Sequence, residues 1–129
     1  MGNVSFLGYK QGKELTGLVA DAYFVIVPSE WYENNPMTII EAYSVGTPVI
    51  GAQIGGIPEI IAEGETGYQF KSGNMESLGK VMTKAMALSK NEYEALSSGC
   101  LRFAHNNLSP ESYYPRLMAF YQQFSQKTQ

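Results

Sequence analysis

The sequence YFVIV at Tyr23–Val27 is a continuous run of β-branched and aromatic residues. A strand with one face in water alternates apolar and polar residues, whereas a run without alternation is typical of a strand covered on both faces. Strands of parallel sheets are covered in this way because the helices that connect them pack on both sides. The run therefore predicts a buried strand of a parallel α/β sheet.

Other apolar runs alternate with helical patterns around this strand. We expect strands at Val4–Leu7, Pro48–Ala52 and Tyr68–Phe70, and helical segments over residues 11–20, 36–45 and 58–62. Such alternation indicates right-handed parallel connections. The predicted fold class is α/β, with a parallel sheet of about four strands flanked by helices and followed by a helical C-terminal tail.

The tail is expected to start near Asn74. Apolar residues at helical spacing predict one helix up to Leu88, capped by Asn74, and a second from Asn91 to about Asn106. Ser109 and Pro110 are suited to open a third helix, whose aromatic residues share one side. We thus expect residues 1–129 to form a single domain, with the strand and helix alternation in 1–73 and the helical tail in 74–129.

The segment Pro28–Pro48 carries the polar residues with the clearest chemical interpretation. Asn35 is suited to cap a helix and Pro36 to its first position, and Gly46 is suited to end it. The free N–H groups of Met37, Thr38 and Ile39 would then attract an anion, above all phosphate. Glu33 would lie in the loop before the helix and Glu41 within it, in an E-x7-E spacing. Two hydroxyl acceptors beside a phosphate-binding helix end would suit a sugar nucleotide.

Composition excludes several other functions. The net charge of −3 gives no basic surface for nucleic acid. No apolar run approaches the ~20 residues that span a bilayer, so no transmembrane segment is expected. A single cysteine, Cys100, allows no internal disulfide and suits a cytoplasmic protein. No metal-ligand spacing is present, and no metal is expected.

The ordered series of motifs resembles the C-terminal, donor-binding domain of GT-B glycosyltransferases of family 4, the group 1 glycosyl transferases. The series covers most of the first 90 residues: FLGY at 6–9, VIVPS at 25–29, ENNPMTIIEA at 33–42, GTPVI at 46–50, GGIPEII at 55–61 and GETGYQF at 64–70. A lone pair of glutamates means little, but the series in this order is specific. The resemblance implies a Rossmann-like fold and a partial C-terminal lobe of such an enzyme.

The resemblance also implies roles for individual residues. Glu41 matches the glutamate that holds the ribose hydroxyls of the nucleotide, and Glu33, the catalytic candidate, matches the one placed against the donor sugar. The remaining donor-binding candidates come from the loop, the helix start, the segment after the first strand and a glycine pair: Asn34, Asn35, Pro36, Met37, Thr38, Ile39, Tyr9, Gly55 and Gly56. Many members have Glu-Gly-Phe-Gly in the loop where this chain has Glu33-Asn34-Asn35-Pro36.

The resemblance implies a glycosyltransferase activity that is retaining and metal-independent. It would transfer a sugar from a nucleotide-diphosphate sugar to an acceptor, without a cofactor. Family members carry an N-terminal acceptor-binding domain, two further strands and a basic pair that this sequence lacks, so we expect a fragment that is inactive alone. An exposed sheet edge would allow a homodimer. The full protein is expected in the cytoplasm, with a peripheral position at the inner face of a membrane as an option.

Plainer interpretations of the same residues stay open. Glu41 can be a solvated helix residue, Glu33 can favour the helix dipole, and Gly55–Gly56 can serve only as a turn. Two alternatives concern the whole chain: a non-catalytic nucleotide-binding α/β module, and another GT-B enzyme such as a sugar-nucleotide epimerase or a phosphorylase. A phosphorylase would carry a pyridoxal-phosphate lysine, and no lysine lies in the motif region.

Overall fold

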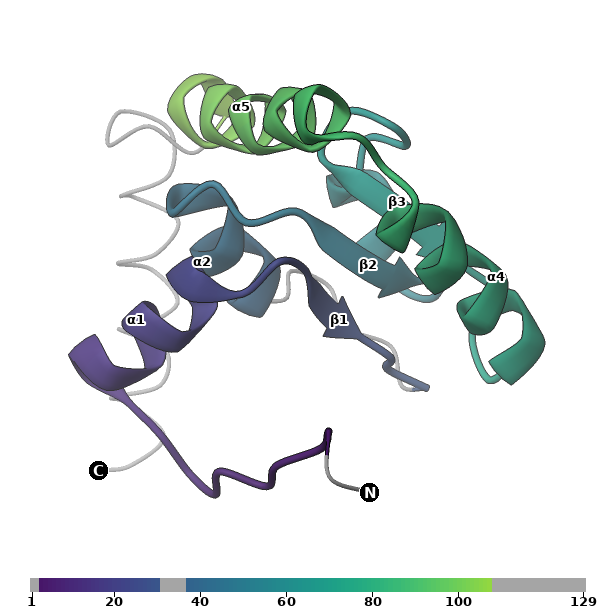
Figure 1. Cartoon of the computed structure of the whole chain (residues 1–129), viewed down its shortest axis with the longest axis horizontal. Coiled ribbons are helices and arrows are strands. Elements are labelled where there is room, and N and C mark those ends of the chain that lie inside the picture. The colour runs from purple at the N-terminus through teal and green to yellow at the C-terminus, as the bar shows by residue number, and fades with distance from the viewer. Residues whose placement is uncertain (1–2, 31–36, 108–129) are drawn as a thin grey trace.

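The computed structural model describes residues 3–30 and 37–107, and its described part is an α/β layer structure (Figure 1). One parallel sheet has the strand order β1 (Val25–Val27), β2 (Val49–Ala52) and β3 (Gly67–Phe70). The helices are α1 (Gly12–Asp21), α2 (Met37–Ser44), α3 (Ile57–Ile60), α4 (Met75–Met86) and α5 (Lys90–Asn107). The fold class predicted from the sequence is confirmed.

The strand expected at Val4–Leu7 does not form, so the described sheet has three strands. Phe6 is 95% exposed and Leu7 55% exposed. A strand needs a neighbour that accepts and donates its backbone hydrogen bonds. In the described residues β1 pairs with β2 along one edge only, and nothing pairs with its other edge. The apolar composition of the segment was therefore not sufficient to predict a strand.

The central strand β2 divides the core into two clusters, because all four of its residues are buried and they point alternately to opposite faces. Val49 packs on one face with residues of α2, α3 and α5, including Ile39, Tyr43 and Cys100. Ile50 packs on the other face with Tyr68 and with residues of α4 and α5. Helices thus cover both faces of the central strand, but the burial on both faces expected at Tyr23–Val27 is only partly found, since Ile26 of β1 is 38% exposed and Tyr23 is 43% exposed.

Helix α2 ends where the sequence predicts. Gly46 has φ of 74°, a left-handed conformation that is accessible to glycine at little cost, and its N–H donates to the carbonyl of Tyr43. The predicted cap Asn35 and first residue Pro36 lie outside the described residues. At the start of α4 the predicted cap is confirmed, since Oδ1 of Asn74 accepts a hydrogen bond from the N–H of Ser77 at 2.9 Å.

Helix α5 runs across α2 and also reaches the opposite face of the sheet (Figure 1). Leu96 belongs to one core cluster, and Cys100, one turn later, belongs to the other. The third helix expected after Ser109 lies outside the described residues. Within residues 3–30 and 37–107, no helix combines the length and the apolar character needed to cross a bilayer.

Candidate active site

The carboxyl ends of the three strands lie together at one edge of the sheet, because all three strands are parallel and in register. Val27 pairs with Gly51, and Ala52 pairs with Phe70. The segments that follow these strands therefore emerge side by side. They lead into α2 after β1, into α3 after β2 and into α4 after β3. In open parallel sheets this edge is where ligands bind.

Helix α2 presents a polar stripe to solvent and buries its other residues. Ile39, Ile40, Ala42 and Tyr43 are buried, whereas Thr38, Glu41 and Ser44 are exposed at a three-residue spacing. This stripe places Glu41 one turn after the helix start. In the described part of the chain, the Glu41 carboxylate has no hydrogen bond or ion pair. It is therefore available to accept hydrogen bonds from a ligand's hydroxyl groups.

The start of α2 also offers donors. The first N–H groups of an α-helix have no partner inside the helix, and here they belong to Met37, Thr38 and Ile39. Because α2 follows β1, its first turn lies at the carboxyl edge of the sheet. The side chain of Ile39 is fully buried and holds this turn against the core. Backbone donors that are fixed in this way fit a phosphate group.

Gly55 and Gly56 form the turn between β2 and α3. Gly55 has φ of 59°, which favours glycine, and Gly56 precedes the first helical residue Ile57. The turn follows Ala52, the last residue of β2, so it lies at the same sheet edge as the start of α2. The glycine turn thus lies at the carboxyl edge of the sheet, and its proximity to Thr38 and Glu41 stays a prediction.

A buried hydroxyl joins α2 to the end of α3. The Tyr43 hydroxyl donates to the carbonyl of Ile60 at 3.1 Å and lies 2.8 Å from Oγ1 of Thr66. Either oxygen could be the donor in this second contact, and the Thr66 hydroxyl can also donate to the carbonyl of Ala62 at 3.5 Å. Thr66 Oγ1 in turn accepts from the N–H of Ala62 at 3.0 Å. Burial raises the pKa of Tyr43 well above its ordinary value, so the phenol stays neutral and keeps the donated proton.

Gln69 of β3 holds the other side of α3. Its amide Nε2 donates to the carbonyls of Ile61 at 2.9 Å and Pro58 at 3.3 Å. Its backbone N–H donates to Oε2 of Glu63 at 2.9 Å. A four-residue helix has too few turns to satisfy its own terminal carbonyls. Side chains from α2 and β3 therefore complete the hydrogen bonding of α3.

Other residues proposed for the site are not placed there by the described structure. Tyr9 is 86% exposed, and its hydroxyl bonds locally to Oε1 of Gln11 at 3.4 Å. Within residues 3–30 and 37–107, no hydrogen bond, ion pair or ring contact joins Tyr9 to α2 or to the glycine turn. Glu33, Asn34, Asn35 and Pro36 lie outside the described residues, so their roles stay predictions.

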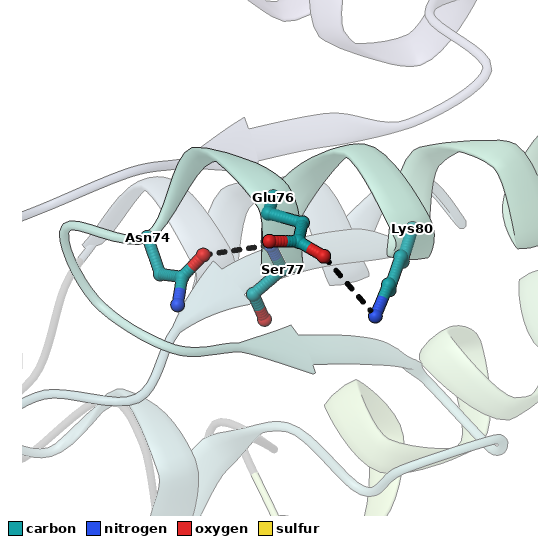
Figure 2. A network of polar contacts seen from close by, with 4 residues as sticks. All are labelled: Asn74, Glu76, Ser77 and Lys80. Atoms are coloured by element: carbon teal, nitrogen blue, oxygen red, sulfur yellow. Dashed lines mark hydrogen bonds and ion pairs between the residues drawn. The ribbon is translucent and has the colours of Figure 1, made fainter.

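The start of α4 forms a polar depression of about 260 Å³, lined by Lys71, Asn74, Glu76, Ser77 and Lys80. Figure 2 shows its contacts: Asn74 caps the N–H of Ser77, and Lys80 forms an ion pair with Glu76 at 3.5 Å. Both charged side chains of the pair are about four-fifths exposed, at 78% and 81%. Exposed pairs contribute little to stability. These contacts explain a well-capped helix and indicate no ligand.

Beside this depression, the loops after β1 and β3 contact each other. The Ser72 hydroxyl donates to the carbonyl of Ser29 at 3.0 Å. A small cavity of about 100 Å³ lies next to this contact and is lined by Pro28, Glu30, Phe70, Gly73, Asn74, Met75 and Leu78. The contact fixes the chain where it enters the loop that precedes α2.

Cys100 belongs to the core and not to the site. Its side chain is fully buried and donates to the carbonyl of Thr66 at 3.3 Å. Burial raises the pKa of the Cys100 thiol to about 12. Thiolate, the reactive form, is then scarce at neutral pH. Among the described residues, no group of three or more His, Cys, Asp or Glu side chains could hold a metal ion.

We expect Cys100 to resist alkylation in the folded chain. Because both access and ionisation are low, iodoacetamide at pH 8 should label native protein at least about 100-fold more slowly than protein in 6 M guanidinium chloride. Mass spectrometry of timed samples measures both rates. Equal rates in the two samples would show that Cys100 is accessible and contradict its placement in the core.

The fold matches that of the C-terminal lobe of GT-B glycosyltransferases. The chain superimposes on sucrose-phosphate synthase from Thermosynechococcus elongatus with a TM-score of 0.80 and 23% identity, covering 98% of this chain and 31% of that one. It matches HepE of Anabaena, solved in complex with UDP and glucose, with a TM-score of 0.76 and 20% identity, over 95% of this chain and 32% of that one.

Sequence comparison identifies the family. The profile described as glycosyl transferases group 1 matches residues 1–106, so the chain belongs to this family. A curated relative, the sulfoquinovosyl transferase SQD2 of Arabidopsis thaliana, is 42% identical over 74 residues. That match covers 55% of this chain and 14% of the relative, so the chain spans only a small part of the relative's length.

Sequence reasoning missed Tyr43, Thr66 and Gln69 as residues that hold the site together. Tyr43 occupies an apolar helical position and is indistinguishable from a core residue by periodicity. Its partners lie 17 and 23 residues further along the chain. The one available signal is that a buried tyrosine hydroxyl needs a polar partner.

Proposed function

We propose that this chain is the donor-binding half of a retaining, metal-independent glycosyltransferase that uses a nucleotide-diphosphate sugar. The observation that carries the proposal is an exposed Glu41 one turn inside α2, which has no hydrogen bond or ion pair within residues 3–30 and 37–107, on the helix whose first N–H groups follow β1. Membership of the glycosyl transferases group 1 family supports it. The solved complex of HepE with UDP and glucose supports the choice of ligand class.

Each part of the edge has a role in the proposal. The Glu41 carboxylate accepts hydrogen bonds from both ribose hydroxyls, as a carboxylate with two oxygens can. The backbone N–H groups of Met37, Thr38 and Ile39 bind the diphosphate. Gly55 and Gly56 let the backbone approach the ligand without a side chain in between.

The sugar end of the donor is assigned to residues outside the described part. Glu33 orients the donor sugar through its hydroxyls, and Asn34, Asn35 and Pro36 supply backbone contacts beside it. Tyr9 remains the candidate for the nucleobase, which would require the segment before α1 to approach the edge when ligand binds.

In the proposed reaction, the bond between the anomeric carbon and the diphosphate oxygen breaks while the acceptor oxygen bonds to the same face of that carbon. The acceptor proton passes to an oxygen of the departing diphosphate. Helix N–H groups stabilise the negative charge that develops on that leaving group. Glu33 acts by positioning, so the reaction needs no covalent enzyme intermediate.

We also propose that the acceptor is bound by a second lobe. The chain covers about a third of the solved glycosyltransferase chains, 31% and 32% in the two matches, and a GT-B active site lies between two lobes that close over the donor. The described chain should therefore bind donor without transferring sugar.

The proposal is tested by calorimetric titration of the chain with UDP-glucose, GDP-mannose and ADP-glucose. Loss of two charge-assisted hydrogen bonds, each worth ~1.5–3 kcal/mol, predicts that Glu41→Ala weakens binding of the preferred donor by about 10² to 10⁴-fold. Glu94→Ala is the control, because it removes the same charge from an exposed position on α5. If Glu41→Ala leaves the affinity unchanged, the ribose assignment is refuted. If the native chain binds none of the three donors, donor recognition by this chain is refuted.

A further inference from the structure

The short helix α3 is held from outside by side chains of two other elements. The side chains of Gln69 and Tyr43 donate hydrogen bonds to two of its carbonyls, those of Pro58 and Ile60, and to the carbonyl of its C-cap residue Ile61. Tyr43 is fully buried and Gln69 is half-buried. A hydrogen bond shielded from water resists exchange with solvent and holds its geometry. We call the two side chains the α3 clamp.

The α3 clamp connects two parts of the candidate site. Tyr43 follows Glu41 by two residues in α2, so the hydroxyl and the carboxylate belong to the same rigid helix. Gly56 directly precedes α3, so a shift of α3 would move the glycine turn with it. The Tyr43 hydroxyl therefore adds a directional hydrogen bond between α2 and the end of α3, beside the apolar contacts of their shared core cluster.

We propose that Tyr43 and Gln69 are positioning residues that set the distance between the glycine turn and α2, and thereby the fit of the sugar diphosphate. This inference rests on the proposed function. It concerns the sugar and diphosphate end of the donor specifically, because Glu41 and the ribose stay on α2 whether or not the clamp is intact.

The test compares two ligands, UDP-glucose and UMP, on variants that lose only a polar group. Tyr43→Phe removes the hydroxyl and Gln69→Met removes the amide at nearly constant volume. Losing one hydrogen bond that fixes the turn predicts about five- to tenfold weaker binding of UDP-glucose, with UMP affinity changed less than about twofold. Calorimetry gives both dissociation constants.

Tyr93→Phe is the matched control. Its hydroxyl also donates to a backbone carbonyl, that of Tyr23 at 2.7 Å, but Tyr23 lies before β1 at the opposite edge of the sheet. This variant should leave both affinities unchanged. Equal weakening of UDP-glucose and UMP in the clamp variants would indicate general loss of structure and overturn the inference. Unchanged UDP-glucose affinity would overturn it as well.

A second readout needs no ligand and separates this inference from the proposed function. The amides of Glu59 and Ile61 donate within the α3 turn, to Gly56 and Ile57. Their hydrogen exchange, followed by NMR, should accelerate in Tyr43→Phe and Gln69→Met and stay unchanged in Tyr93→Phe. Exchange that does not accelerate would reject the clamp itself. The native chain could fail to bind UDP-glucose and UMP while exchange still accelerates in the two clamp variants. That result would support the α3 clamp as a structural feature and reject its role in donor binding.

Discussion

Replacing Gly67 with alanine is expected to disrupt the pairing of β2 and β3 and to unfold much of the chain. A Cβ at position 67 would overlap the backbone oxygen of Val49 and approach its carbonyl carbon and nitrogen at 2.8 and 2.9 Å. Val49 is the ladder partner of Gly67 and lies in the fully buried central strand. Neither backbone can move without breaking a row of hydrogen bonds.

Gly67→Ala is expected to lower the free energy of unfolding by more than about 3 kcal/mol, a loss typical of substitutions that disrupt backbone packing. Urea denaturation followed by circular dichroism measures it. Gly79→Ala is the matched control, because Gly79 lies in α4 with nothing within 4 Å of an added Cβ. That change should stabilise the chain by about 0.5–1 kcal/mol through helix propensity. A Gly67→Ala variant as stable as Gly79→Ala would contradict the close strand approach.

Replacing Ile39 with alanine is expected to lower the free energy of unfolding by about 2–5 kcal/mol. Ile39 is fully buried in the first turn of α2 and packs in the cluster that includes Tyr43 and Val49. The cavity left behind removes contacts from both the helix and the sheet. Since this side chain anchors the turn that carries the proposed phosphate donors, its loss also loosens the candidate site.

A graded series separates packing from helix propensity. Ile39→Val should cost about 0.5–1.5 kcal/mol, and Thr38→Ala, at the exposed neighbouring position, should change stability by less than about 0.5 kcal/mol. Thermal and urea unfolding of the three variants measure their order of stability. If Ile39→Ala proved no more harmful than Thr38→Ala, the first turn of α2 would not be anchored as described.

The order of elements could be predicted from the sequence because most of the signals are local. The helices at α1, α4 and α5 follow from apolar spacing. The end of α2 and the start of α4 follow from Gly46 and Asn74, whose roles depend on a few adjacent residues. The run at Tyr23–Val27 predicts burial on both faces, and this is only partly correct: Phe24 and Val27 pack in opposite clusters, but Ile26 between them is exposed.

The wrong prediction at Val4–Leu7 and the missed α3 clamp have a common cause. A strand exists only if a second strand pairs with it, and a hydroxyl orders a site only if an acceptor arrives from elsewhere. Neither partner is visible in the segment itself. Exposed Phe6 and buried Tyr43 therefore could not be interpreted from their neighbours in the sequence. The roles of Glu33 and its loop remain predictions, since those residues lie outside the described part.

Helix α5 has a consequence for how the chain loses its structure. Leu96 contributes to one core cluster and Cys100 to the other, so the same helix closes both faces of the sheet. If α5 detaches, both clusters become exposed to water at once, and neither keeps enough buried area to persist alone. We therefore expect the two sides to unfold in a single cooperative event, without a stable intermediate that keeps one face intact.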